Sequence, residues 1–491
     1  MTVKRPKNFR KPIENRVRAL QHARFEGEVA AKMRKWSTLL LALVMVFTLA
    51  ACGGGSGNGG GKGNSGPSSS SSGGSGGGGG SAGDKPVTLR VLHWINEPVN
   101  KFMNDVFIPQ FEQKYPNLKI EYTTVPSDDT YDQLMQTRIN ANDADIMAYR
   151  SAFVGAPQEW SPGAADPLWK QWADAGLIAD LTNESFLSYY NPKDNENAVY
   201  YNGKAYGVNM GKVSFTGLYY NKEIFEKHNL QIPKTWDEFV GLLETLKSNG
   251  VTPLGFAGRD VWPFNLAVQG LQATIHDDQL AYIKGLWTGE SKWTDPAAIE
   301  ILEKAQVLMN YAQEGFMGLD YGTLPSVFAS GQVAMIADGT WNAPTYASLN
   351  PDLRFGYFPV PGSNDPAKNA YLAGKYDMTW MVVEKSPNKE WALKFLEELS
   401  VPENYTAFVN AAGFLPNQDV KVESEFINEI MPYLGEFKLA WDQLFINREN
   451  VGQYASASSV HAEFLKPAGP IATAQELAAL SQKDWDAAAP K

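Results

Sequence analysis

The stretch between Val87 and Tyr149 alternates between two hydrophobic periodicities, and this alternation most constrains what the chain can fold into. Apolar residues recur at every second position in some runs and at every third or fourth position in the runs between them, as in strands and helices respectively. The pattern predicts strands over Val87–Trp94, Leu118–Val125 and Asp145–Tyr149, separated by helices over Asn100–Tyr115 and Asp129–Ala141. Strands joined by helices at this spacing form right-handed crossovers in a parallel sheet, so we expect an α/β fold.

A second α/β unit is predicted further along the chain. Thr235-Trp236-Asp237-Glu238 has the T-x-x-E capping-box pattern that opens a helix, and Gly250 stands where the residue after such a helix is expected. The remaining predicted elements are strands over Thr216–Asn221, Thr252–Phe256 and Val333–Ala337 and a helix over Pro296–Gln313.

The residues before the first strand have the pattern of an export signal. Basic Arg34 and Lys35 precede the apolar run LLLALVMVFTLAAC, which ends at Cys52, the chain's one cysteine. A spanning helix needs about 20 apolar residues, so the run indicates a secretory signal more than an uncleaved anchor. Its end, Leu49-Ala50-Ala51-Cys52, resembles the bacterial lipoprotein signal (the lipobox), which implies that Cys52 is lipidated, becomes the new N-terminus and tethers the rest to a membrane. Translation that begins at Met33 would give a complete signal by itself, whereas translation from Met1 would give it a long basic extension.

The residues after Cys52 are predicted to be a flexible tether. Residues 53–84 are almost wholly Gly and Ser, which cannot bury apolar surface and which behave as a random coil. We therefore expect everything beyond this tract to lie outside the cytoplasm.

Charge and cysteine content exclude several classes of protein. The formal net charge is −11, although the first 35 residues hold 11 basic and 3 acidic side chains, so the remainder is strongly acidic. An acidic body argues against nucleic acid as a partner, since polyanions require a positive field. With Cys52 in the signal, the body contains no disulfide, and a body of this length needs none. Exported proteins without disulfides fit a lipid-anchored protein of a Gram-positive bacterium.

Four segments together resemble the family 1 extracellular solute-binding proteins, the receptors of carbohydrate ABC importers, of which maltose-binding protein is a member. The segments are LYYNKEIFEKHNLQIPKTWDEF at Leu218–Phe239, VFASGQVAMIADGTW at Val327–Trp341, FGYFPVPG at Phe355–Gly362 and NKEWALKFLEELS at Asn388–Ser400. The resemblance covers the chain from Pro86 to about Asn417. It implies a two-lobed periplasmic-binding-protein fold of the Venus-flytrap type, with strands crossing between the lobes and one ligand held in the cleft.

The resemblance also implies an organisation of the whole chain. We expect a basic extension over 1–32, a lipoprotein signal peptide over 33–52 and a linker over 53–85. Lobe 1 would consist of 86–215 and 373–417, and lobe 2 of 216–372 and 418–491. The expected protein is a monomeric receptor on the outer face of the cell membrane, anchored by an acyl group such as palmitate on Cys52. It would deliver a carbohydrate to the transmembrane subunits of an ABC permease, and it would need no cofactor and no metal.

The resemblance and the strand ends nominate residues for a sugar site. A sugar has apolar C–H faces, which suit aromatic rings, and a rim of hydroxyls, which suits carboxylate, amide and guanidinium groups. Trp94 and Asn96 match a Trp-Ile-Asn segment of the family, Tyr149 falls where a family member has a stacking tryptophan, and Trp341 is the family's G-x-W aromatic. The other nominated residues are Arg150 beside Tyr149, Arg259, Asp260 and Trp262 in one loop, and Tyr376 and Asp377 in a return segment that departs from the family's Gly-rich pattern.

Three alternatives remain open from the residues. A secreted glycosidase would need two carboxylates about 5–9 Å apart, and the adjacent acids of this chain, such as Asp128-Asp129, do not face each other on a helix. Outside the Gly/Ser tract of residues 53–84, no H-E-x-x-H or G-x-S-x-G motif occurs, so no catalytic or metal-ligating residue is nominated. A rigid surface lectin and a receptor for a non-sugar solute share the same features. Arg150 and Arg259 would also suit a carboxylated sugar, because arginine binds carboxylates bidentately.

Overall fold

The computed structural model describes residues 86–126, 129–151, 157–435, 437–455 and 460–490. The described residues form one compact unit, and every sheet and core described below lies within it. The predicted signal peptide, Cys52 and the Gly/Ser tract lie outside the described residues. Among the described residues, no helix is both long enough and apolar enough to cross a membrane.

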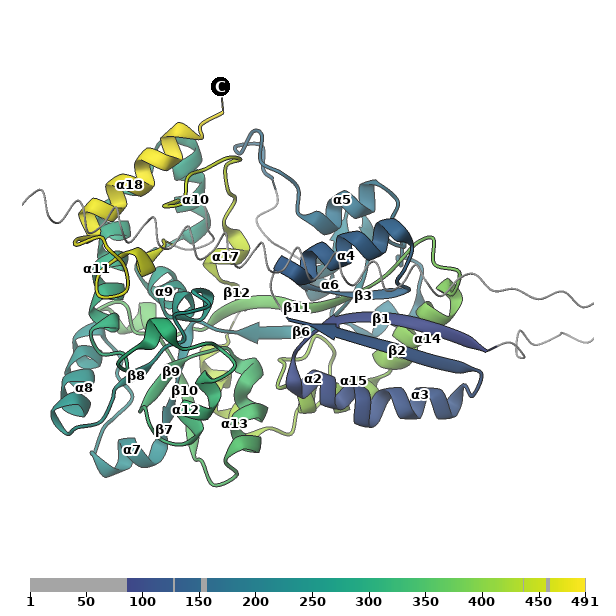
Figure 1. Cartoon of the computed structure of the whole chain (residues 1–491), viewed down its shortest axis with the longest axis horizontal. Helices are drawn as coiled ribbons and strands as arrows, with labels where there is room; N and C mark the ends of the chain where they lie inside the picture. The colour runs from purple at the N-terminus through teal and green to yellow at the C-terminus, as the bar shows by residue number, and fades with distance from the viewer. Residues whose placement is uncertain (1–85, 127–128, 152–156, 436, 456–459, 491) are drawn as a thin grey trace, which may run out of the picture. The chain divides into compact units, whose positions relative to one another are not determined.

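A six-stranded sheet organises the first half of this unit (Figure 1). Its order is β12 (Lys438–Leu439), β11 (Ala373–Val382), β3 (Ile146–Ser151), β1 (Val87–Trp94) and β2 (Leu118–Val125), and β6 (Val208–Ser214) also pairs with β11. β1 runs parallel to β2 and β3, whereas β11 runs antiparallel to β3 and β6. The predicted bounds of β1 and β2 are confirmed, and β3 begins one residue later and ends two residues later than predicted.

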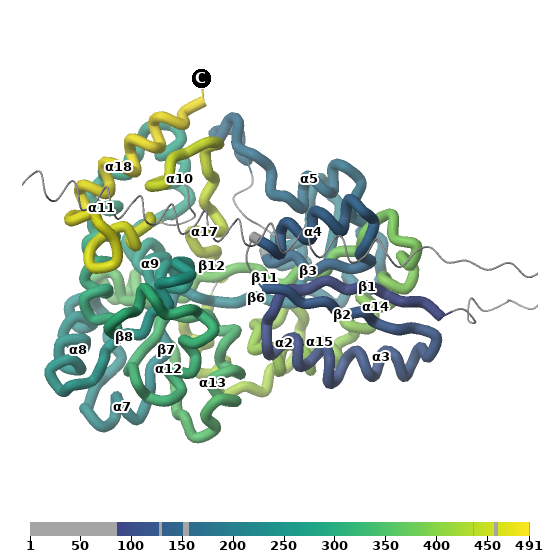
Figure 2. Tube along the Cα trace, viewed as in Figure 1, coloured from purple at the N-terminus to yellow at the C-terminus, as the bar shows by residue number. Residues whose placement is uncertain are grey.

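Helices cover both faces of this sheet. In Figure 1, α4 (Asp129–Ala141) and α5 (Leu168–Asp174) lie over one face, and α2 (Glu97–Phe102), α3 (Ile108–Lys114) and α15 (Pro402–Ala412) lie over the other. Figure 2 shows α15 beside α2, although about 300 residues separate them in sequence. This half also contains a 3-10 helix over Ser185–Tyr189, α6 (Pro192–Val199), α14 (Lys389–Ser400) and a small hairpin of β4 (Tyr200–Tyr201) and β5 (Lys204–Ala205).

The first crossover differs from the single helix predicted over Asn100–Tyr115. A π-helical turn over Met103–Phe107 separates α2 from α3, and the Ile108 N–H donates to the Met103 carbonyl five residues back. The cause is Pro109, which has no N–H to continue the helical ladder and whose ring needs space against the preceding turn. The predicted bounds of α4 are confirmed.

A four-stranded sheet organises the second half, in the order β10 (Phe355–Pro359), β7 (Gly217–Asn221), β9 (Met335–Ala337) and β8 (Leu254–Gly255). β8 and β9 are shorter than the strands predicted over Thr252–Phe256 and Val333–Ala337, because only two or three residues of each find a partner. Helices pack around the sheet: α7 (Lys222–Lys227), α8 (Trp236–Ser248), α9 (Trp262–Ile275), α10 (Gln279–Thr288), α11 (Pro296–Met309), α12 (Leu324–Ala329), α13 (Ala343–Leu349) and α16 (Glu425–Ile430).

The predicted start and end of α8 are confirmed. The Thr235 hydroxyl accepts a hydrogen bond from the Glu238 N–H at 3.3 Å, and the Glu238 carboxylate accepts one from the Lys234 N–H at 2.7 Å. The first bond satisfies a donor that the first helical turn leaves free, and the second satisfies the N–H of the residue before the cap. Gly250 ends the segment with φ +73°, a conformation that glycine adopts without steric cost.

The C-terminal segment packs against the second half. α17 (Trp441–Leu444) contacts α9 and α10, and α18 (Ala474–Ala487) packs against α11 (Figure 1). Between these helices, Trp287 and Trp485 enclose the guanidinium of Arg448, whose carbon lies 5.2 and 4.3 Å from the two ring centroids. Arg448 donates to backbone carbonyls near the C-terminal ends of α18 and α10, where the helix dipoles favour a cation.

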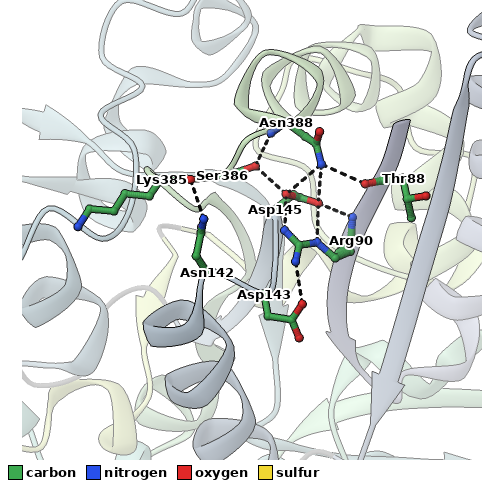
Figure 3. Close-up of polar contacts among 8 residues, drawn as sticks. All are labelled: Thr88, Arg90, Asn142, Asp143, Asp145, Lys385, Ser386 and Asn388. Atoms are coloured by element: carbon green, nitrogen blue, oxygen red, sulfur yellow. Dashed lines mark hydrogen bonds and ion pairs between the residues drawn. The ribbon is translucent and has the colours of Figure 1, made fainter. Parts of the chain in front are cut away.

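Asp145 fixes the start of β3 through a buried polar network (Figure 3). Its carboxylate accepts bonds from the Arg90 backbone N–H at 2.7 Å, from the Arg90 guanidinium at 3.0 and 3.2 Å, and from the Ser386 hydroxyl at 2.6 Å. Burial alone would raise the pKa of Asp145, but these donors outweigh it and hold the pKa below its ordinary value. The network joins β1, β3 and the segment before α14.

Candidate functional site

Three aromatic side chains form a partly exposed face in the second half. Trp262, the first residue of α9, lies on Tyr321 with ring centroids 4.4 Å apart, and its side chain is 40% exposed. The indole N–H of Trp341 donates to the Tyr321 hydroxyl at 2.7 Å. Tyr321 therefore connects the two tryptophans in one continuous surface, which we call the aromatic face. Both tryptophans were nominated from the sequence, and Tyr321 was not.

An unusual backbone conformation places Trp262. Val261, which precedes it, has φ +61°, a left-handed conformation that is rare for a β-branched residue and costs about 1–3 kcal/mol. Strain of this kind persists only where the surrounding structure imposes it, and it concentrates at functional sites.

Charged groups border the aromatic face. Arg259 Nε lies 3.7 Å from Asp260 Oδ1, and Arg259 Nη1 lies 3.4 Å from Asp320 Oδ2. The guanidinium of Arg259 thus lies beside two carboxylates. Asp260 also accepts the Tyr321 backbone N–H at 2.7 Å, which fixes the turn that carries the tyrosine. The nominated residues Arg259, Asp260 and Trp262 are thus brought together with Trp341.

A buried carboxylate lies behind the aromatic face. Asp338 is fully buried and accepts hydrogen bonds from the Tyr321 hydroxyl at 2.8 Å, from the Asn342 amide at 2.6 Å, from the Gly339 N–H at 2.8 Å and from the Tyr346 hydroxyl. Burial raises the pKa of Asp338 to about 6, in spite of these donors.

A charged cluster lies at the end of β3 in the first half. Arg150 pairs with Asp132 of α4 and lies 5.8 Å from the Tyr131 ring centroid. Lys375 of β11 pairs with Asp377 at 3.2 Å and donates to the Arg150 carbonyl at 3.4 Å. The Asp377 carboxylate also accepts the Met378 N–H, where the strand turns through φ +57°.

Two carboxylates of this cluster are costly to ionise. Burial raises the pKa of Asp377, and Lys375 only partly opposes that effect. Burial likewise raises the pKa of Asp442 in α17, to which Lys375 is also electrostatically coupled. Lys375 therefore favours the charged form of carboxylates in two elements, Asp377 of β11 and Asp442 of α17.

The end of β6 lies between the charged cluster and the aromatic face. Lys375 pairs with Val213 in the β11–β6 register. The next residue, Ser214, donates its backbone N–H to the Thr340 hydroxyl at 3.1 Å, and the ring of Phe215 lies 6.0 Å from that of Trp341. The charged cluster and the aromatic face thus flank the strand end that leads from the first sheet into the second.

The other nominated residues, Trp94, Asn96, Tyr149 and Tyr376, pack within the first half. Trp94 is 5% exposed and packs edge-on against Tyr131, and Asn96 caps α2 by accepting the Val99 N–H at 3.3 Å. Tyr149 packs edge-on against Trp172, and Tyr376 donates to Asp194 at 2.9 Å. For these four residues, as for the nominated residues of the aromatic face and the charged cluster, the ligand role remains a prediction.

Two cavities lie apart from the nominated residues. One of about 880 Å³ is lined by residues around the start of α8, including Leu230, Lys234 and Tyr433, and one of about 380 Å³ is lined by residues around Trp287 and Arg448. Within the described ranges, no group of three or more His, Cys, Asp or Glu side chains is placed to hold a metal ion.

Comparison with known proteins gives a consistent result. The model of the family described as bacterial extracellular solute-binding protein matches residues 95–406. A multiple sugar-binding protein of Streptococcus mutans is 26% identical over 321 residues, which cover 62% of this chain and 70% of that protein. The melibiose/raffinose/stachyose-binding protein of Bacillus subtilis is 24% identical over 353 residues, covering 66% and 76%.

Solved structures share the fold. The solute-binding protein RafE in complex with raffinose superposes with a TM-score of 0.65 at 22% identity, over 82% of this chain and 98% of that chain. A chitin oligosaccharide binding protein gives a TM-score of 0.65 at 21% identity, over 83% and 99%. The two-lobed α/β fold expected from the sequence is thereby confirmed. The protein belongs to the family of bacterial extracellular solute-binding proteins.

Proposed function

We propose that this protein captures a carbohydrate between its two halves and delivers it to the permease of an ABC importer. The observation that carries the proposal is the aromatic face of Trp262, Tyr321 and Trp341, bordered by Arg259 and its carboxylates. Rings of this kind cover the C–H faces of a sugar, and the charged rim bonds its hydroxyls. Relatives that bind raffinose, stachyose and other sugars support the same conclusion.

The pairing of the charges favours a neutral sugar over a carboxylated one. Arg150 already pairs with Asp132, and Arg259 lies beside two carboxylates. Lys375 likewise already pairs with Asp377 at 3.2 Å. A uronate brought to these arginines would face the carboxylates that hold them, so the electrostatic attraction that a free guanidinium pair would supply is largely cancelled.

Capture between two halves requires that both contact the ligand. A bound state with contacts to both sheets shifts the population toward the closed arrangement, and a permease can distinguish the two arrangements by shape. We propose the lobes as 86–215 with 373–417 and 216–372 with 418–491. β12 lies in the last of these segments and pairs with β11 of the first sheet, which would tie the two lobes together at that point.

The predicted signal peptide over residues 33–52 suggests how the protein is held at the membrane. We propose that the chain is exported and that Cys52 carries the lipid, so that residues 86–491 act as a monomer at the outer face of the cell membrane. A Cys52→Ser variant should then be released into the medium, whereas wild-type protein should partition with membranes. A variant that stays membrane-bound would refute lipidation at Cys52.

A glycan-active enzyme and a lectin are the rival functions. The family and the relatives named above are binding proteins, which favours a receptor. Incubation with a glycan followed by chromatography would reveal an enzyme by the loss of the glycan. Solution scattering separates the other two, since a transport receptor becomes more compact on binding and a rigid lectin does not.

A thermal-shift screen of residues 80–491 tests the proposal. The panel contains raffinose, stachyose, melibiose, diacetylchitobiose, xylo-oligosaccharides and galacturonate. A ligand at 100 times its Kd stabilises the folded state by about 2.7 kcal/mol, which gives a measurable increase in Tm. We expect one neutral oligosaccharide to respond and galacturonate to have no effect. No response to any member of the panel would refute a ligand among these carbohydrates.

A further inference from the structure

Asp338 has a full set of hydrogen-bond donors around its carboxylate. Tyr321 and Gly339 donate to Oδ1, and Asn342 and Tyr346 donate to Oδ2. Four donors fill the acceptor sites of an ionised carboxylate, and no place remains for a proton. This arrangement therefore fits the charged form, although burial disfavours it.

The Tyr321 hydroxyl is equally saturated. A phenol has one hydrogen to donate and two lone pairs with which to accept. Tyr321 donates its hydrogen to Asp338 and accepts the Trp341 indole N–H and the Asn342 amide, both at 2.7 Å. The direction of every bond from Asp338 to Trp341 is thus fixed by the charge on the carboxylate.

Protonation would break this chain of bonds. A proton on Oδ1 would point at the Tyr321 hydroxyl, which could accept it only by giving up Trp341 or Asn342. A proton on Oδ2 would point at Tyr346, whose own hydrogen would then lose its acceptor in a fully buried position. Either outcome leaves a buried donor unsatisfied, which costs about 1–3 kcal/mol.

Among the titratable side chains of this network, Asp338 is the one that titrates in the physiological pH range. The titratable side chains facing it are Tyr321 in the turn before α12, Tyr346 in α13, Tyr219 in β7 and Tyr357 in β10. Burial holds the pKa of each tyrosine well above its ordinary value, so all four stay neutral in the physiological range. Among the described residues, no cationic side chain donates to Asp338, whose pKa is raised to about 6.

We propose that Asp338 is a positioning residue. Its charge, acting through the Tyr321 hydroxyl, holds Trp341 in the orientation that binds sugar. Protonation of Asp338 therefore lowers the affinity of the protein for its ligand. The sugar part of this inference rests on the proposed function, whereas the coupling between Asp338 and Trp341 does not. If only the ionised form binds, about one molecule in eleven is competent at pH 5, and the affinity there is about tenfold lower than at pH 7.5.

The coupling is tested without any ligand. In ¹⁵N-labelled protein, the indole N–H resonance of Trp341, assigned by its loss in Trp341→Phe, is followed from pH 7.5 to pH 5. We expect a shift with a midpoint near pH 6. Tyr321→Phe removes the hydroxyl that relays the charge and should abolish the shift. A wild-type resonance that does not move, or a Tyr321→Phe resonance that moves as in wild type, would overturn the proposal.

Tyr346→Phe is the matched control. It removes the same chemical group from the same carboxylate, on the side away from Trp341. The shift should persist, and its midpoint should move to higher pH because one donor that favours the charged form is lost. If Tyr321→Phe does not fold, Asp338→Asn replaces it, and its Trp341 resonance should be independent of pH. A titrating resonance in Asp338→Asn would show that another group is responsible.

Binding is then measured with the sugar that responds in the thermal-shift screen. Wild type should lose about tenfold in affinity between pH 7.5 and pH 5, and Tyr321→Phe should show no such dependence. A titrating resonance together with an affinity that is independent of pH would overturn the positioning role. If no sugar binds at all while the resonance titrates, the proposed function fails and the coupling between Asp338 and Trp341 is upheld.

Discussion

Replacing Asp145 with asparagine should remove a large part of the stability of the first half. The carboxylate is fully buried and accepts three bonds from Arg90 and one from Ser386. The variant leaves the guanidinium of Arg90 without its buried counter-charge and turns an amide N–H toward existing donors. Arg90 is 21% exposed and keeps its pair with Asp143, so the cost should lie below that of a fully buried pair, at about 2–3 kcal/mol, against a total of about 5–15 kcal/mol for a typical domain.

Asp143→Asn is the matched control, because Asp143 pairs with the same arginine at 2.7 Å (Figure 3). Its side chain is 60% exposed, and exposed pairs contribute about 0–1 kcal/mol. The comparison therefore holds the arginine constant and changes the burial of its partner together with the number of hydrogen bonds that the partner accepts.

Urea denaturation followed by circular dichroism measures both variants. Asp145→Asn should lower the unfolding midpoint strongly and Asp143→Asn barely. Because the folded-state pKa of Asp145 is lowered, its stabilisation is present above the unfolded-state pKa and is lost as the pH falls through the folded value. Wild type should accordingly lose more stability in acid than Asp145→Asn. Equal losses for the two variants at neutral pH would refute the argument from burial.

Two further predictions concern the aromatic side chains. Trp341→Ala should weaken sugar binding by about 1–3 kcal/mol in calorimetric titration, because it removes a ring of the aromatic face. The control Tyr189→Ala, which changes an exposed aromatic side chain of the first half, should leave the affinity unchanged. Arg448→Met should lower the free energy of unfolding by about 1–3 kcal/mol, since three backbone carbonyls lose their donor, and Lys421→Met, at an exposed cation, should have little effect. Unchanged affinity in the first variant, or unchanged stability in the second, would contradict the role given to that side chain.

Much of the fold could be predicted because its determinants are local. β1, β2 and α4 have the predicted bounds, and α8 begins at the predicted cap, since alternation, periodicity and capping residues all act within a few positions. The π-helical turn before Pro109 and the shortness of β8 were missed. Both depend on how backbone groups find partners in three dimensions, which a hydrophobic pattern does not record.

The candidate site could be predicted only in part, for the same reason. Trp341 and Arg259 were nominated from the resemblance and from a loop position, and the structure brings both to one surface. Tyr321 and Lys375 were missed because their roles arise from contacts across the fold. The Lys375 ammonium donates to the Arg150 carbonyl, which is 225 residues away in sequence, and no local spacing predicts that contact. Asp338 could have been noticed as the acid next to the G-T-W segment, since the sequence places it beside Trp341.

Hydrogen exchange with and without the responding sugar tests the central claim most directly. The account predicts slower exchange on both sides of the β6 strand end, in the segment around Thr340–Asn342 of the second half and in the segment around Lys375–Thr379 of the first. Protection of both segments would show that one ligand is held between the two sheets. Protection of only one segment, or of neither, would contradict capture of a carbohydrate between two halves.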